Sequence, residues 1–454
     1  MMILRSMFRR RIVIEAAWVF AGQMASAAAT LVGLRLITDL VSPSVYGTIV
    51  LVVGTVGLAH GLVAGPWMQS VLRLYPEVAA AGAEGELRRA TWVGLRKPVI
   101  AALLLMGAPG AIWTLSHPEH TWTAVLALVL LAAEIARSVE VTFLSASRRQ
   151  RAMALLIAVD AWLRISGALA LVVVFGPSSA AVLGGYLLGC GATLGGYRLL
   201  GRRRDSGNRF SSPTVLLSPE ALLPRMWIYA LPLAPLPLIA WVSAQADRYL
   251  LAGMAGISAA GLYAAMYGLA SKPFMLLSGT VDLALRQPYY TRVSAADHTA
   301  ERAALALWLR AVTAGSLLLY LPFALFHRQI AALALGSDYR DHSALMAWIA
   351  AGYALLCMAQ VFERVCYAYG DTRGVLWIQG CGALLSLAVA APLVARWGIR
   401  GAAWAVPVSF SAQLMIAAAR ARRARRIGIT KNLHFSRPSP TSTVKVSTGP
   451  APQN

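Results

Sequence analysis

The most chemically informative residues of this chain are cations that lie within long apolar segments. Lys272 lies in ASKPFML and Arg310 in LWLRAV, and neither has an acidic residue three or four positions away. A charge exposed to hydrocarbon costs at least about 2.5–3.5 kcal/mol, so each cation should face a polar interior. A buried cation left available suits a phosphate, because charge-assisted hydrogen bonds strengthen where water is scarce. The sequence therefore predicts an anion-binding site, and it predicts no catalytic residue, metal site or cofactor.

Three more cations are candidates for this site, although each has an acid nearby in the sequence. Arg248 follows Asp247, but adjacent residues of a helix point about 100° apart, so this pair need not neutralise itself. Arg35 lies four residues before Asp39, and Arg137 lies three residues after another acid. Ion pairing within one helix is therefore the alternative explanation for Arg35 and Arg137.

Acidic residues in the same segments could bind a proton or a sodium ion. The candidates are Asp247, Asp160 and Glu134. Asp160 and Arg164 are four residues apart, and Glu134 shares a helix face with Arg137, so intrahelical neutralisation is again the alternative. An ion-coupling carboxylate and a structural ion pair give the same sequence pattern, so both interpretations stay open.

The segments that carry these residues are long enough to cross a membrane. About twelve apolar stretches approach the roughly 20 residues that a spanning helix needs. The chain has 454 residues, of which 58% are hydrophobic and 13% charged, and its mean hydropathy of +0.62 excludes an ordinary soluble enzyme. The sequence therefore predicts an all-α integral membrane protein. We expect spans near 12–38, 46–72, 98–115, 121–144, 152–175, 179–200, 224–252, 261–287, 303–325, 343–366, 375–394 and 401–419.

Arginine residues concentrate in alternate connectors between these spans. They are abundant before the first span, in every second connector after it, and in RARRARR at 420–426. The opposite connectors hold only Arg328, Arg340, Arg396 and Arg400. Because cations are retained on the cytoplasmic side, we expect both termini to be cytoplasmic and the protein to lie in the inner membrane. Anionic membrane lipids, and not nucleic acid, then explain the formal charge of +22.

The two halves of the chain repeat one pattern. SPSVYGTIVLVVGTVGLAHG at 42–61 matches GISAAGLYAAMYGLASK at 256–272, so that Gly47 corresponds to Gly261. Two such halves are typical of transporters that rock one half against the other around a central site. We expect four parts, which are an N-terminal six-helix bundle at 1–200, a cytoplasmic linker at 201–223, a C-terminal six-helix bundle at 224–420 and a basic, disordered cytoplasmic tail at 421–454.

Three segments resemble a known family. They are LRLITDLVSPSVYGTIVL, LPLAPLPLIAWVSAQADRYLLAGMAGISAAGLYAAMYGLASKP and GIRGAAWAVPVSF. The chain resembles the polysaccharide flippase (Wzx-like) family of the MOP exporter superfamily over residues 12 to 420. The resemblance implies two pseudo-symmetric six-helix bundles that move an undecaprenyl-diphosphate-linked oligosaccharide from the cytoplasmic to the periplasmic leaflet without covalent chemistry. A polysaccharide polymerase and a chain-length regulator would then be its protein partners.

The seventh predicted span contains three prolines in LPLAPLPL. Pro232, Pro235 and Pro237 lack amide donors and have fixed φ angles, so a regular helix is disfavoured there. The sequence predicts a hinge or a broken helix beside the cavity, and a kinked but continuous helix is the alternative.

Other functions fit the sequence less well. The chain has no G-K-[ST] sequence, which excludes a P-loop ATPase. The longest external connector, at 327–343, is short for the catalytic loop of a membrane glycan polymerase or ligase. A multidrug exporter of the same superfamily would need free lumenal carboxylates, whereas the excess of cationic candidates favours an anionic substrate.

Overall fold

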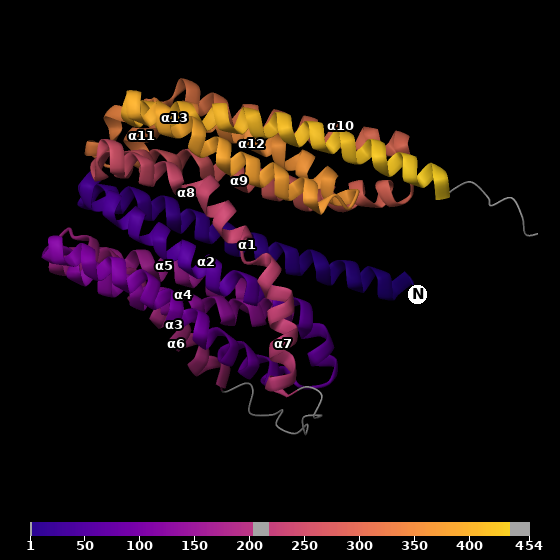
Figure 1. Cartoon of the computed structure of the whole chain (residues 1–454), viewed down its shortest axis with the longest axis horizontal. Coiled ribbons are helices and arrows are strands. Elements are labelled where there is room, and N and C mark those ends of the chain that lie inside the picture. Colours follow the sequence, from indigo (N-terminus) through magenta and orange to yellow (C-terminus); the bar gives the residue numbers. More distant parts are fainter. Residues whose placement is uncertain (1, 203–217, 436–454) are drawn as a thin grey trace, which may run out of the picture.

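The chain folds into two bundles of long helices that cross the molecule side by side (Figure 1). The computed structural model describes residues 2–202 and 218–435, and the side chains of 17–199 and 218–427. No described residue lies in a β-strand. The prediction of an all-α, multi-pass membrane protein built from two six-helix bundles is confirmed.

The N-terminal bundle is built around the long apolar runs of the first half of the chain. Its core contains the fully buried side chains of Val71, Leu87, Leu131 and Leu183, which come from four different helices. The helices end at short turns, and Gly176 supplies a positive φ of +86° at one of them. The bundle consists of α1 (Met2–Leu40), α2 (Pro43–Ala80), α3 (Glu84–Ser116), α4 (Thr121–Ala146), α5 (Gln150–Phe175) and α6 (Ser179–Arg202), with a 3₁₀ turn at Pro118–His120.

The C-terminal bundle has a more aromatic core. Tyr263, Phe274 and Trp308 are among its most deeply buried side chains. One helix breaks at Gly398, where φ is +54°, so α13 contributes two successive spans. The second half consists of α7 (Pro219–Ala230), α8 (Leu236–Ala255), α9 (Ile257–Ser294), α10 (His298–Leu325), α11 (His327–Ala334), α12 (Leu345–Ala368) and α13 (Thr372–Phe435), with 3₁₀ turns at Leu231–Leu233 and Ser337–His342.

Nine helical segments among the described residues are long and apolar enough to cross a membrane. In this count α7 and α8 form one segment, and the two halves of α13 form another. Helices α4 and α9 run alongside the others, although they carry charged residues in their middle (Figure 1). Separating the halves of α13 and adding α4 and α9 gives the twelve spans that the apolar pattern predicts.

The proline-rich segment breaks the seventh span into two helices that belong to different bundles. Helix α7 packs against α2 and α3, whereas α8 packs against α9 and α13. Trp227 of α7 lies edge-on to Trp67, with ring centroids 5.0 Å apart, and Arg225 donates to Glu77 at 2.6 and 2.8 Å. The helix α7 at 219–230 thus packs on the N-terminal bundle and the change of bundle occurs at the 3₁₀ turn, whereas the sequence analysis places the start of the C-terminal bundle at 224.

The last helix extends further than the predicted disordered tail allows. Helix α13 continues to Phe435, because adding residues to an existing helix gains one hydrogen bond per residue without a new nucleus. Arg425 of this extension donates to the fully buried carboxylate of Glu301 at 2.8 Å. Burial and the same carboxylate raise the pKa of Tyr369, in the turn before α13, to about 12. Residues 436–454, and most of the predicted linker, lie outside the described residues.

The two bundles meet at one end of the molecule and diverge toward the other (Figure 1). We call the end where α1 begins and α13 finishes the terminal end, and this is where the bundles diverge. At the opposite end, α1 and α2 contact α8, α9 and the residues around α11. The structure is thus held together mainly at the end away from the chain termini.

Candidate functional site

Two cations lie close together on α8 and α9 of the C-terminal bundle, and we call them the cation cluster. Arg248 is only 9% exposed, and its guanidinium carbon lies 4.7 Å from the centre of the Tyr267 ring. Such a cation–π contact stabilises a guanidinium without neutralising it. Lys272 lies near enough to Arg248 for the two positive charges to interact. Neither cation has an ion pair among the residues that the structure describes.

The acid beside this cluster is engaged elsewhere. One oxygen of Asp247 accepts a hydrogen bond from the hydroxyl of Tyr263 at 2.6 Å, and the other accepts from the main-chain amide of Arg248 at 2.8 Å. The Nε atom of Arg248 is buried and has no hydrogen-bond partner among the described residues. The cluster therefore keeps positive charge and a donor available for a ligand.

Lys272 faces the space between the bundles. It follows Gly268 by four residues, so both lie on the same face of α9, and Gly268 lines a cavity formed mainly by the N-terminal bundle. The Lys272 side chain is exposed. A cation in this position can meet a ligand that enters between the bundles.

Four charges in the N-terminal bundle form a closed network, which we call the neutral cluster. It consists of Glu134 and Arg137 of α4 and Asp160 and Arg164 of α5. Arg137 pairs with Glu134 at 2.9 Å and with Asp160 at 3.6 Å. Arg164 pairs with Asp160 at 2.9 Å and also with Glu134. Two carboxylates and two guanidinium groups leave no net charge.

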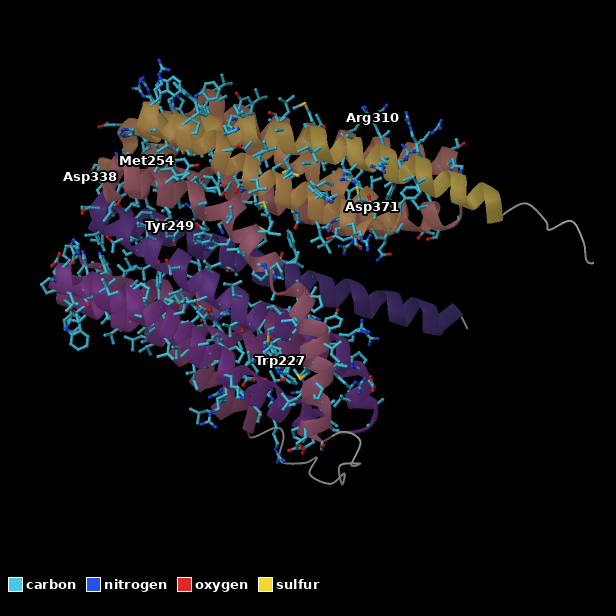
Figure 2. All side chains as sticks on the ribbon, viewed as in Figure 1. Trp227, Tyr249, Met254, Arg310, Asp338 and Asp371 are labelled. Atoms are coloured by element: carbon cyan, nitrogen blue, oxygen red, sulfur yellow. The ribbon has the colours of Figure 1, made fainter. Side chains whose placement is uncertain are left out.

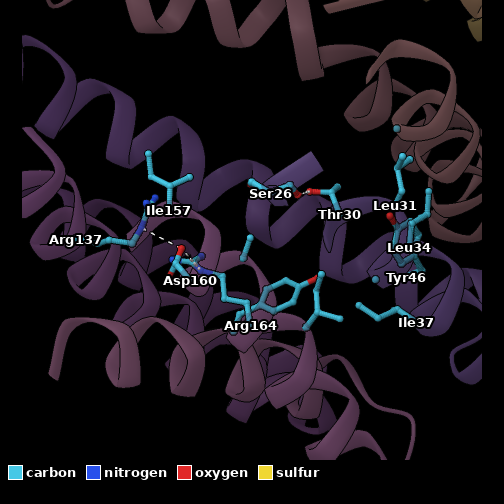
Figure 3. Close-up of a pocket in the computed structure, with 15 residues that line it drawn as sticks. Ser26, Thr30, Leu31, Leu34, Ile37, Tyr46, Arg137, Ile157, Asp160 and Arg164 are labelled. Carbon is cyan, nitrogen blue, oxygen red and sulfur yellow. Dashed lines mark hydrogen bonds and ion pairs between the residues drawn. The ribbon is translucent and has the colours of Figure 1, made fainter. Parts of the chain in front are cut away.

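The neutral cluster forms one wall of a cavity of about 430 Å³ (Figure 3). Arg137, Asp160 and Arg164 lie on one side of it, and Ser26 and Thr30 of α1 lie on another. Its remaining walls include aromatic and aliphatic side chains, with Tyr46, Tyr186 and Ile37 among them. The cavity thus combines charged groups of balanced sign, hydroxyl groups and apolar surface.

The other cationic candidates do not join the cation cluster. Arg310 lies on the outer edge of the C-terminal bundle, on the side away from the N-terminal bundle (Figure 2). Helix α10, which carries it, packs against α9 and α12 of its own bundle. Arg137 belongs to the neutral cluster. Arg35 pairs with Asp39 and donates to the carbonyl of Leu335 at 2.7 Å, so it serves contact between the bundles.

Several contacts between the bundles use main-chain carbonyl groups as acceptors. Tyr249, for example, lies where α8 meets the N-terminal bundle (Figure 2). Besides the bond of Arg35, these contacts are Tyr339 Oη to Val41 O (3.0 Å), Trp241 Nε1 to Gly54 O (2.8 Å) and Tyr249 Oη to Leu51 O (2.7 Å).

The repeated glycines make a very close approach between the bundles. A Cβ atom on Gly261 would lie 2.0 Å from the carbonyl oxygen of Pro43, and one on Gly47 would lie 2.2 Å from that of Ile257. Only glycine permits this backbone contact. The pair Gly47 and Gly261, which identifies the repeat in the sequence, is also where α2 and α9 touch.

The aromatic part of the candidate site was not predicted from the sequence. Tyr263, Tyr267 and Tyr353 stand in one row, with successive ring centroids 5.5 Å apart, and Tyr353 donates to the Tyr267 hydroxyl at 2.9 Å. Tyr263 and Tyr267 are four residues apart, a spacing that could have indicated that they share a face of their helix. Tyr353 lies far away in the sequence and gave no such signal.

Solved structures of membrane transporters have the same arrangement of helices. An inward-facing conformation of a multidrug resistance MATE family transporter of the MOP superfamily matches with a TM-score of 0.65 and 13% identity, covering 91% of this chain and 96% of that chain. The lipid II flippase MurJ, in an inward closed conformation, matches with a TM-score of 0.67 and 11% identity, covering 94% of each chain. This chain has the MOP fold.

The MOP fold extends over almost the whole chain. The outward-facing conformation of a multidrug resistance MATE family transporter also matches this chain, with a TM-score of 0.58 and 15% identity. No protein-family model and no curated protein sequence matches the chain. Because one fold carries different functions, the substrate of this MOP-fold chain must be argued from its own side chains.

Proposed function

We propose that this protein is a flippase that moves a polyprenyl-diphosphate-linked oligosaccharide across the inner membrane. The observation that carries the proposal is the cation cluster, in which neither Lys272 nor Arg248 forms an ion pair among the described residues and Lys272 faces the space between the bundles. A diphosphate supplies the negative charge and the acceptor oxygens that these two groups lack. The lipid tail can stay in the bilayer while the polar headgroup crosses between the bundles.

The proposed movement is a rocking of the two bundles about their line of contact. The bundles meet at the end away from the termini, and α7 and α8 divide between them at the proline-rich turn. In the proposed orientation the terminal end is cytoplasmic, so this conformation would admit the lipid from the cytoplasmic leaflet. Reporter fusions after Gly207 and after Ser337 should read cytoplasmic and periplasmic respectively. The same side for both fusions would overturn this orientation.

A multidrug exporter with the same fold is supported less well. A hydrophobic cation would need a free carboxylate, but Glu134 and Asp160 each pair with two guanidinium groups. Asp247 accepts bonds from a hydroxyl and a main-chain amide and from no cationic side chain among the described residues. We propose it as the acid that could couple transport to a proton or sodium ion, ahead of Asp160 and Glu134.

Transport by the purified protein tests the proposal directly. The full chain is placed in vesicles with a fluorescent undecaprenyl-diphosphate glycan, and a membrane-impermeant quencher reports the fraction of lipid in the outer leaflet. The wild-type protein should speed the exchange between leaflets, Lys272→Ala should abolish this, and Lys272→Arg should retain part of it. Lys97→Ala, which removes an exposed cation of α3, is the matched control. Full activity of Lys272→Ala would contradict the proposal.

In cells, the proposal predicts that the protein acts with enzymes that build and extend the glycan. A polysaccharide polymerase and a chain-length regulator are its proposed partners, since they would use the lipid-linked product on the periplasmic side. Loss of Lys272 should then cause the lipid-linked glycan to accumulate in the cytoplasmic leaflet. No bond of the glycan is made or broken in the proposed step, so the protein itself needs no catalytic group.

A further inference from the structure

The cavity in the N-terminal bundle contains buried polar atoms that have no partner. Asp160 is only 5% exposed, yet its Oδ1 atom forms no hydrogen bond with any described residue, and neither does the buried Nη2 atom of Arg164. Both residues line the cavity. Leaving such groups unsatisfied costs free energy, so the cavity offers an acceptor and a donor that a ligand could use.

The charge of the cavity excludes some ligands. Glu134, Arg137, Asp160 and Arg164 sum to zero and pair with one another. A phosphate or a cation would therefore have to compete with an existing ion pair, which makes either a poor ligand here. An uncharged group that can both donate and accept hydrogen bonds fits the unpaired atoms without breaking the network.

The rest of the lining has the chemistry of a carbohydrate site. The hydroxyl groups of Tyr46 and Tyr186 can donate or accept, and that of Thr30, which donates to the carbonyl of Ser26, can still accept. Aromatic rings and Ile37 provide apolar surface for the C–H faces of a sugar. The cavity volume of about 430 Å³ lies within the range of small-ligand sites.

The cavity also lies beside the cation cluster. Gly268 lines it, and Lys272 follows one turn later on the same face of α9. Tyr46, on the cavity wall, is close enough to Arg248 to interact with its charge. A ligand whose anionic group bound Lys272 and Arg248 would therefore place its next chemical group at the cavity.

We propose that this cavity is a carbohydrate-binding subsite that holds an uncharged sugar of the lipid-linked substrate. This inference rests on the proposed function for the identity of the whole substrate. The N-terminal bundle selects the sugar and the C-terminal bundle holds the diphosphate. A site built to bond hydroxyl groups discriminates strongly against ligands that lack them, because its buried polar groups are then left unpaired.

Binding of four lipids to the full chain in nanodiscs tests whether one bundle binds the sugar and the other binds the diphosphate. The probes are undecaprenyl diphosphate and the same lipid carrying glucose, galactose or N-acetylglucosamine. At least one glycosylated lipid should bind the wild-type protein about tenfold more tightly than the bare lipid. Tyr186→Phe combined with Thr30→Val should remove most of this preference and leave the affinity for the bare lipid unchanged. Tyr229→Phe combined with Thr114→Val is the matched control, since Tyr229 is exposed, Thr114 makes an exposed hydrogen bond, and both lie outside the cavity.

A second measurement examines the cavity without the lipid. In a Thr30→Cys variant, high concentrations of the methyl glycosides of the same three sugars should slow labelling by a maleimide, and inorganic pyrophosphate should not. Failure of the bare lipid to bind, together with protection by a glycoside, would overturn the proposed substrate and support the subsite. Equal binding of all four lipids, or no protection by any glycoside, would overturn the subsite.

Discussion

The two bundles carry similar charged residues inside the membrane-spanning helices, but they use them in opposite ways. In the N-terminal bundle, two cations and two acids on α4 and α5 satisfy one another. In the C-terminal bundle, Arg248 lies over an aromatic ring and next to Asp247, but neither Arg248 nor Lys272 forms an ion pair with a carboxylate among the described residues. Residue type alone therefore does not show which cation can bind a ligand. What decides this is whether the cation forms an ion pair with a carboxylate within about 4 Å.

Removing one member of the neutral cluster should have the largest effect. Arg164→Ala leaves Glu134 and Asp160 with one cation between them, and loss of one partner from a buried ion pair costs about 3–5 kcal/mol. The measurement is the free energy of unfolding in mixed micelles, followed by tryptophan fluorescence. Arg89→Ala, whose side chain is 74% exposed in its ion pair, should cost less than about 1 kcal/mol. Equal losses in the two variants would show that the cluster is not a structural network.

Replacing a cation of the cation cluster by alanine should leave stability intact and weaken ligand binding instead. Lys272→Ala removes a repulsion with Arg248, so the free energy of unfolding should stay unchanged or rise slightly. Binding of undecaprenyl diphosphate should weaken by about 2 kcal/mol, or roughly thirtyfold, because a charged donor is lost. Isothermal titration of the purified variant measures this. A destabilised protein with normal affinity would reverse the assignment of the two clusters.

The contact between α2 and α9 is a close backbone contact between the two bundles. Gly261→Ala would place a methyl group 2.0 Å from the carbonyl of Pro43, and overpacking of this kind costs about 1–3 kcal/mol. In a Ser44→Cys/Ser258→Cys background, the substitution should lower the disulfide crosslinking yield between the bundles. Gly253→Ala, where no atom lies within 4 Å of the added methyl group, is the control and should leave the yield unchanged.

The smallest effect is expected at Arg310, the cation that resembles Lys272 most in sequence. Because it lies on the outer edge of its bundle, Arg310→Ala should change neither lipid affinity nor unfolding free energy by more than about 0.5 kcal/mol. The same titration and unfolding measurements apply. Loss of transport with Arg310→Ala would mean that a second route exists on the outside of the C-terminal bundle.

The number and type of the helices could be predicted because each span must satisfy its own backbone hydrogen bonds in lipid. Long apolar runs bounded by arginine, glycine and proline therefore identify helices without any knowledge of their neighbours. The bundle boundary was harder to predict. The prolines indicated a break, but only the packing of Trp227 and Arg225 on α2 assigns α7 to the N-terminal bundle.

The candidate site could be predicted only within single helices. The spacing rule identified the pair of Asp160 and Arg164 and the lack of an intrahelical partner at Lys272. The spacing rule also found no intrahelical partner for Arg310 and so did not distinguish it from Lys272. Spacing along one helix does not indicate which face of the helix meets the other bundle. The contact of Arg164 with Glu134 joins two helices, so no local pattern could reveal it.

The hydrogen bonds between the bundles have a consequence for how such sequences can diverge. At Val41, Leu51, Gly54 and Leu335 the acceptor is a main-chain carbonyl, which every amino acid possesses and which keeps a second lone pair when the first serves the helix. Each of these bonds thus constrains the side chain of one partner only. Mutational drift at the four acceptor positions leaves the bonds intact, and this tolerance offers one physical route by which an architecture can persist at 11–15% identity.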